Sequence, residues 1–132
     1  MNFFFLKKGK DQLGSNRIYI DNLSQWISEL GHRVEVSNQL KFDLSYNVYI
    51  LSKYSNLNDI LEIRKFSEKT LVGLIHPTDL NQYNSKMMNN CDFLIVGSIE
   101  ERDYYLNFHN NIIRFPQIEK IDMYNKVHKD NN

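Results

Sequence analysis

The histidine best placed for chemistry is His76, which follows the apolar run 70–75 and precedes Pro77. Proline removes a backbone donor and restricts the residue before it, so the chain turns at this point. An imidazole at a strand end can act as a general base, orient a hydroxyl or donate to a phosphate, and Asp79 lies close enough in sequence to tune it. The alternative is a polar residue that closes a strand beside a structural proline. We predict His76 as the catalytic residue.

A second candidate is the loop after the first apolar run, which carries Gly9 and Gly14, with Ser15 at the start of a predicted helix. Such a loop could cradle an anion. Its glycine spacing matches a phosphate-binding P-loop, but Ser15 and Asn16 stand where that motif needs lysine and then serine or threonine, which disfavours nucleotide hydrolysis. The dinucleotide fingerprint G-x-G-x-x-G is also missing. The structural alternative for Gly14 is a tight strand-to-helix turn.

Ser98 opens a predicted helix with Glu101 three residues later, the spacing of a capping box. Capping is the favoured explanation, and contact of Ser98 with a ligand is the alternative. Four aromatic residues fall at helical positions, where aromatic side chains more often pack in a core or against a partner than stack on a cofactor. We assign no chemistry to these four: Tyr19, Trp26, Tyr104 and Tyr105.

Composition narrows the function further. The 16 basic and 16 acidic side chains cancel, which disfavours nucleic acid as a partner. Cys91 is the single cysteine, so neither an internal disulfide nor a thiolate metal cluster can form, and no metal-ligand spacing occurs among the histidines and carboxylates. No apolar segment reaches the roughly 20 residues of a membrane-spanning helix, and the N-terminus does not have the pattern of a secretory signal. We therefore expect a cytoplasmic protein without a transmembrane segment or a bound metal.

Short apolar runs alternate with amphipathic segments along the chain, which is typical of parallel sheets with helical crossovers. The fold class predicted is α/β, a single Rossmann-like three-layer α/β/α domain over residues 1–116 with a mostly parallel sheet of about six strands, followed by a polar, loosely docked tail over 117–132. The second strand is expected near an edge. The predicted strands are 3–6, 34–36, 47–51, 70–75, 91–96 and 112–115, and the predicted helices are 17–30, 57–66, 80–90 and 98–106.

In such a sheet, ligands bind beyond the carboxyl ends of the strands. The loops that leave these ends would bring Gly14, His76 and Ser98 to one common rim. A phosphoacceptor receiver domain shares this general sheet but needs acidic residues after the first strand and an aspartate after the third. Lysines 7 and 8, and then Ser52 and Lys53, occupy those positions instead, so this function is excluded.

Four segments together resemble the N-terminal, acceptor-side half of GT-B glycosyltransferases of the group 1 type. They are Gly14-Ser15-x-Arg17, Leu30-Gly31-His32-x-Val34, the run from Cys91 through Asp92 to Ser98, and the strand 112–115 before Pro116. The similarity covers roughly nine-tenths of the chain, and the order and spacing of the segments carry it. It implies a Rossmann-like fold and a nucleotide-sugar donor as substrate.

By this resemblance, Gly14 and Ser15 are expected near the donor diphosphate, with Arg17 among the substrate-binding residues. His76 is expected to face the acceptor with Asp79 behind it, and Ser98 and Arg102 to line the same cleft. The family's site lies between two domains, and the sequence matches one of them.

The leading hypothesis is therefore a glycosyltransferase-like domain that contributes the acceptor half of a metal-independent, nucleotide-sugar-dependent transfer site, with a second chain supplying the missing half. In this hypothesis the domain is incomplete alone. The alternative is a non-catalytic module with the same fold that binds a ligand or a partner.

Overall fold

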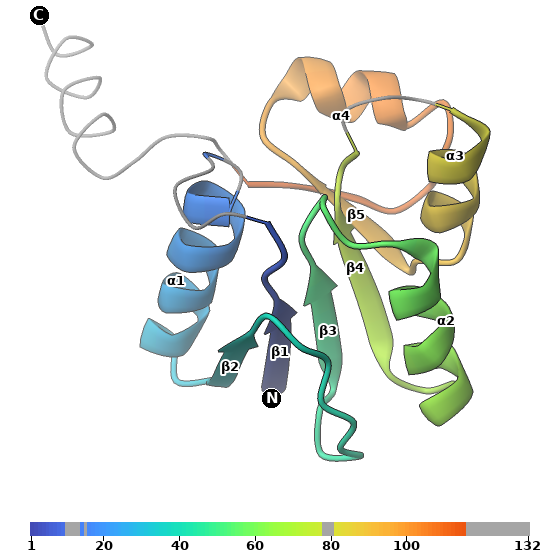
Figure 1. Cartoon of the computed structure of the whole chain (residues 1–132). Coiled ribbons are helices and arrows are strands. Elements are labelled where there is room, and N and C mark those ends of the chain that lie inside the picture. The colour runs from blue at the N-terminus through green and yellow to red at the C-terminus, as the bar shows by residue number, and fades with distance from the viewer. Residues whose placement is uncertain (10–13, 15, 78–80, 116–132) are drawn as a thin grey trace, which may run out of the picture.

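The computed structural model describes residues 1–9, 14, 16–77 and 81–115, without the side chain of Arg17. In this part of the chain six strands form one parallel sheet in the order β2-β1-β3-β4-β5-β6 (Figure 1). The predicted α/β fold is confirmed, and β2 lies at an edge as expected. The strands are β1 (Asn2–Leu6), β2 (Arg33–Ser37), β3 (Val48–Leu51), β4 (Leu71–Ile75), β5 (Phe93–Val96) and β6 (Ile112–Arg114).

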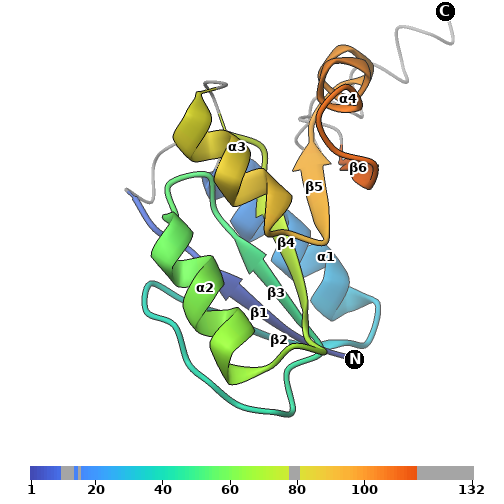
Figure 2. The same cartoon turned by 90° about the vertical axis from the view of Figure 1, so that its right-hand side faces the viewer.

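Helices cover both faces of the sheet. On one face lie α2 (Leu57–Phe66) and α3 (Gln82–Asn89), and α4 (Ile99–Tyr105) adds Tyr105 to the same core. On the other face lie the π-helical segment η1 (Asn16–Asn22) and its continuation α1 (Leu23–Glu29). Figure 2 shows α1 and the pair α2 and α3 on opposite sides of the strands. The chain adds β2 and β3 on opposite sides of β1, so right-handed crossovers place α1 and α2 on opposite faces.

Covering both faces explains why the strands read as continuous apolar runs instead of alternating ones. In β1, Phe4 and Leu6 pack toward α2 and α3, whereas Phe3 and Phe5 pack toward η1. Each such side chain stabilises the fold by about 1.5–3 kcal/mol when fully buried. Cys91 lies in the α2–α3 core just before β5, and burial raises the pKa of its thiol to about 12.

The predicted helix 17–30 differs from the observed one in two ways. The observed segment Asn16–Asn22 is π-helical, a wider winding in which the neighbouring side chains of Tyr19 and Ile20 both lie in the core. Leu30, the last residue of the predicted helix, is exposed, since the observed helix ends at Glu29 and Gly31 takes a φ of 96° just beyond. Such a conformation favours glycine and is common just after the end of a helix. Trp26 is half exposed and its ring lies 5.9 Å from that of Phe115.

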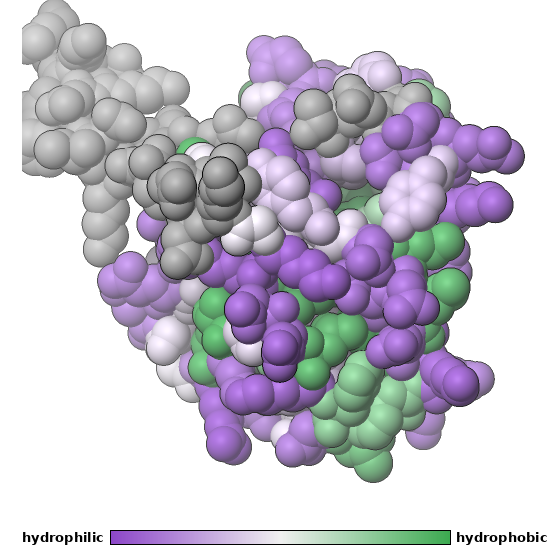
Figure 3. Space-filling model, in the orientation of Figure 1, coloured by the Kyte–Doolittle hydropathy of each residue, from purple (hydrophilic) through white to green (hydrophobic). Residues whose placement is uncertain are grey.

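The tail predicted over 117–132 lies outside the described residues. Among the described helices, none has the length and apolar character needed to cross a membrane. Figure 3 shows that the face of the molecule turned to the viewer in Figure 1 is hydrophilic over most of its area, with apolar side chains gathered low on it. The exposed rings of Phe42, before β3, and Phe66, at the end of α2, lie 5.4 Å apart. Both therefore lie near the edge of the sheet where β3 and β4 begin.

The second helix, α2, has the bounds predicted for it, 57–66. Ile60 and Ile63 face the core, whereas Leu61 is exposed. Arg64 reaches from the last turn of α2 across the amino end of β4. Its guanidinium donates to the carbonyl oxygens of Thr70 (3.0 Å) and Asn90 (3.0 and 3.2 Å) and to Asp92 Oδ2 (2.8 Å), and that carboxylate also accepts from the Val72 N–H. One side chain thus joins α2, α3, β4 and β5.

Gly73 in β4 marks a close approach between two strands. A Cβ built on Gly73 would come within 2.2 Å of the ring of Phe93, its partner in β5. The ring of Phe93 therefore occupies the space that a side chain at position 73 would take.

We predict that Gly73→Ala lowers the free energy of unfolding by about 1–3 kcal/mol, the usual cost of overpacking. In a Phe93→Ala background the same substitution should cost close to nothing, because the ring is gone. Urea unfolding of the four members of this double-mutant cycle measures the coupling. If Gly73→Ala lowers the free energy of unfolding equally with and without the Phe93 ring, the ring moves aside freely and the predicted clash is wrong.

We predict that Arg64→Ala lowers the free energy of unfolding by about 1–3 kcal/mol, since it removes charge-assisted hydrogen bonds to two carbonyl groups and Asp92. Arg64→Lys should fall between this variant and the wild type, because an ammonium group cannot reach all three acceptors at once. The matched control is Lys65→Ala at the next, exposed position of α2, expected within about 0.5 kcal/mol of the wild type. If denaturant unfolding gives Arg64→Ala and Lys65→Ala the same free energy of unfolding, Arg64 does not have the stabilising role assigned to it.

Candidate functional site

The carboxyl edge of the sheet brings together polar residues that follow different strands. Three such residues follow the ends of the neighbouring strands β1, β3 and β4: Lys8, Lys53 and His76. The His76 N–H donates to the Ile95 carbonyl, which keeps the end of β4 beside β5. Because all six strands are parallel, the segments after β1, β3, β4 and β5 leave from this same edge.

The imidazole of His76 contacts the carboxylate of Glu101 in α4. Its Nε2 lies 2.8 Å from Glu101 Oε2, and its Nδ1 lies 3.3 Å from the carbonyl oxygen of Pro77. The other oxygen of Glu101 accepts from the Gly97 N–H (3.1 Å) and from the Ser98 hydroxyl (3.2 Å). The orientation of the imidazole is thus fixed by a carboxylate that is itself held at the start of α4.

Two tyrosine rings enclose this imidazole. The ring centroid of Tyr105 lies 5.4 Å from that of His76, and the ring of Tyr19 meets His76 edge-on at 6.1 Å. The Tyr105 hydroxyl donates to the Pro77 carbonyl, so α4 also fixes the backbone that follows β4. As a result only 12% of the His76 side chain is exposed, and 29% of the Glu101 side chain.

Burial lowers the pKa of His76 below its ordinary value of 6.5, and the charge of Lys53 lowers it further. Glu101 and the Pro77 carbonyl oppose this shift, because both favour the protonated ring. His76 is therefore neutral at neutral pH. In the tautomer that donates Nε2–H to Glu101, the lone pair is on Nδ1, and Glu101 stabilises the imidazolium that forms when Nδ1 takes a proton.

The structure brings some of the predicted site residues together and leaves others apart. His76 and Ser98 both contact the carboxylate of Glu101. Ser98 also caps α4 as predicted, with its hydroxyl accepting from the Glu101 N–H at 3.1 Å. Arg102 instead pairs with its neighbour Asp103 at 3.2 Å. The predicted site residues Ser15 and Asp79, and the side chain of Arg17, lie outside the described part of the chain.

Gly14 is exposed, and a Cβ built on it would meet no atom within 4 Å. The described glycine of this loop with a positive φ, 90°, is Gly9. Gly9, at the start of the loop, therefore has a backbone conformation that favours glycine.

Sequence reasoning missed Glu101 as the carboxylate partner of His76. Its position three residues after Ser98 was fully explained by helix capping, and Asp79 was nearer to His76 in sequence. The signal that could have found it is topological: β4 and β5 are adjacent, so the first turn of the helix after β5 reaches the end of β4.

A second polar cluster lies between the ends of β1 and β3. Lys8 Nζ contacts both carboxylate oxygens of Asp59 (2.9 and 2.8 Å), and the Lys8 N–H donates to the Ser52 hydroxyl. Asp59 also accepts from the Asn56 N–H in the capping box of α2. Lys7 pairs with Asp21 of η1 at 2.7 Å. The charges of both lysines are thus matched by carboxylates of the helices beside them.

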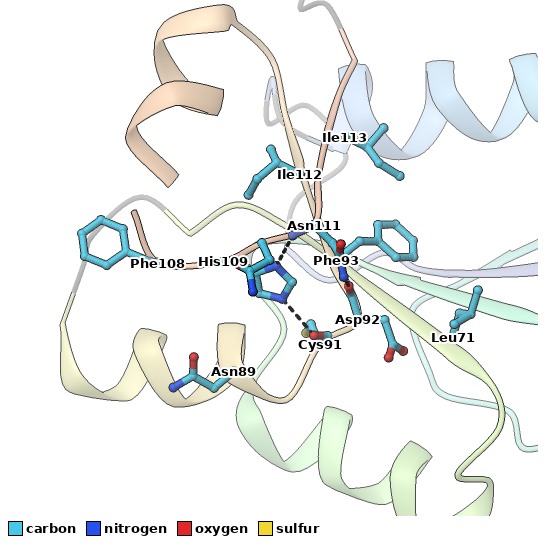
Figure 4. A pocket seen from close by; sticks show the side chains of 11 residues that line it. Leu71, Asn89, Cys91, Asp92, Phe93, Phe108, His109, Asn111, Ile112 and Ile113 are labelled. Atoms are coloured by element: carbon cyan, nitrogen blue, oxygen red, sulfur yellow. Dashed lines mark hydrogen bonds between the residues drawn. The ribbon is translucent and has the colours of Figure 1, made fainter. Parts of the chain in front are cut away.

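A groove of about 850 Å³ lies at the opposite edge, between the starts of β4 and β5 and the chain before β6 (Figure 4). It is large enough for a small molecule, but its polar groups hold the chain itself. His109 Nε2–H donates to the Cys91 carbonyl and Nδ1 accepts from the Asn111 N–H, both at 3.0 Å. The Asn111 amide donates to the Asp92 carbonyl. These contacts leave the carboxyl edge, with His76, as the better candidate site.

No three His, Cys, Asp or Glu side chains gather at metal-binding distance within the described ranges. Comparisons with protein-family models, with curated proteins and with solved structures gave no match to this chain. The function therefore has to be argued from the carboxyl edge itself.

We predict that the free energy of unfolding falls as the pH drops from about 7.5 to about 5.5, and that His76→Gln removes part of this fall. The pKa of His76 is lower in the folded state than its ordinary 6.5, so the unfolded chain takes up the proton first. Stability from this residue is thus present above pH 6.5 and lost below it. Glutamine keeps an N–H donor for Glu101. Urea unfolding at both pH values makes the comparison, and an unchanged pH dependence in His76→Gln would contradict the assignment.

Proposed function

We propose that this domain binds a sugar or nucleotide-sugar ligand at the carboxyl edge of β4 and β5 and contributes the acceptor half of a sugar-transfer site. The observation that carries the proposal is the buried, neutral His76 whose Nε2 is held by Glu101 at 2.8 Å. A carboxylate behind an imidazole is the arrangement that prepares a general base. The resemblance to the N-terminal half of GT-B glycosyltransferases supports sugar transfer as the reaction.

In the proposed reaction, Nδ1 of His76 takes the proton of an acceptor hydroxyl. The hydroxyl oxygen then bonds to the anomeric carbon of the donor, and the bond from that carbon to the diphosphate breaks, so that the diphosphate leaves with the electron pair. Glu101 stabilises the imidazolium that results. A second chain would supply most of the donor site, and we place the complex in the cytoplasm, in keeping with a single, buried cysteine.

A non-catalytic binding module is the second candidate. The observation that favours it is that both ring nitrogens of His76 already face acceptors of the protein itself, Glu101 and the Pro77 carbonyl. In this second candidate function, the role of His76 is to join β4 to α4. Ligand binding and its dependence on His76 separate the two candidates.

We expect UDP- or GDP-sugars, titrated into the full chain at pH 7.5, to shift the amide resonances of residues 97–101 and the ring resonances of His76 in a saturable way. His76→Ala should weaken binding at least fivefold, because the donor sugar loses a polar contact with the imidazole. Lys65→Ala, on the exposed face of α2, is the matched control and should bind as the wild type does. Circular dichroism checks that both variants are folded. No saturable shift at millimolar ligand refutes sugar binding by this chain and favours the module.

A further inference from the structure

Lys53 differs from the two lysines that follow β1. Lys7 pairs with Asp21 and Lys8 with Asp59, whereas Lys53, two residues after β3, has no carboxylate within ion-pair distance among the described residues. Its ammonium group lies 5.5 Å from the ring centroid of Tyr54 and its side chain is half-buried. A cation on an aromatic ring keeps its charge available to a further anion.

The topology gives Lys53 a specific place. The strand order β2-β1-β3 reverses direction at β1, so the topological switch point of the sheet lies at the carboxyl ends of β1 and β3. Ligands of open α/β sheets bind at such switch points. Lys8 follows β1 and Lys53 follows β3, so both leave the sheet at this point. Because Asp59 matches Lys8, Lys53 supplies the unmatched positive charge.

Lys53 also lies beside His76. Lys53 follows β3 and His76 follows the neighbouring strand β4, and the positive charge of Lys53 lowers the pKa of the imidazole. Glu101 lies on the other side of that ring, at Nε2. Across the edge the order is therefore cation, neutral imidazole and carboxylate, which favours a ligand with an anionic end at Lys53 and a hydroxyl-bearing end toward His76.

We propose that Lys53 binds the phosphoryl group of the ligand, at the switch point between β1 and β3. The proposal deepens the proposed function and rests on it for the identity of the whole ligand, a phosphorylated sugar or nucleotide sugar with the sugar at His76. The phosphoryl chemistry itself is shared by a nucleoside diphosphate and by free pyrophosphate. Pyrophosphate therefore tests Lys53 without any sugar.

The experiment is a titration of the full chain with inorganic pyrophosphate at pH 7.5 and constant ionic strength, followed by the amide resonances of residues 52–56 and the ring resonances of His76. We expect saturable shifts in the wild type and at least a fivefold weaker affinity in Lys53→Gln. Lys65→Gln removes the same charge from the exposed face of α2 and should bind within twofold of the wild type. Constant ionic strength keeps general screening the same in all samples.

Shifts that do not saturate, or an equal affinity in Lys53→Gln and the wild type, overturn the proposal. An equal loss in Lys53→Gln and Lys65→Gln also overturns it, because the binding would then follow net charge alone. Saturable pyrophosphate binding that needs Lys53 supports the phosphoryl site. If, in addition, nucleotide sugars bind no tighter than pyrophosphate and leave the His76 ring resonances unshifted, the proposed sugar function is refuted while the phosphoryl site stands.

Discussion

Burial of both faces of the sheet is the constraint on which the rest of this structure depends. In β1 and β3 every residue from Phe3 to Leu6 and from Val48 to Leu51 is buried, so a polar side chain can appear only where a strand ends. Because the strands are parallel, these ends share an edge. The same packing that stabilises the domain thus gathers Lys8, Lys53 and His76, although they are far apart in the sequence.

The carboxylate of Glu101 shows how one side chain can serve the fold and the site together. It accepts hydrogen bonds from Gly97 and Ser98 at the start of α4 and also holds His76 Nε2. The hydrogen bonds at the start of α4 fix the orientation of this carboxylate toward the imidazole, so no further residue is needed to hold it. Tyr105, one turn further along α4, adds a contact to the carbonyl of Pro77. The position of α4 therefore determines the orientation of the imidazole.

Much of the fold follows from local sequence pattern, whereas most of the site does not. The strands could be predicted from apolar runs, and the start of α4 from the spacing of Ser98 and Glu101, because hydrophobic periodicity and helix capping are local properties. The pairing of His76 with Glu101 depends on which strands are neighbours, and the distinction between Lys8 and Lys53 depends on where Asp59 falls. The role of Arg64 could not be predicted from the sequence, since its acceptors at Thr70, Asn90 and Asp92 come together only in the folded chain. The π-helical winding of η1 has no signal that we can identify in the sequence.

The buried thiol of Cys91 has a practical consequence. It is the single sulfhydryl of the sequence, it lies in the α2–α3 core, and its high pKa keeps it as the unreactive thiol at neutral pH. An alkylating reagent can therefore attack it only when the core around the start of β5 opens. The rate at which the native protein is labelled therefore reports how often the core opens at this position, without any engineered probe.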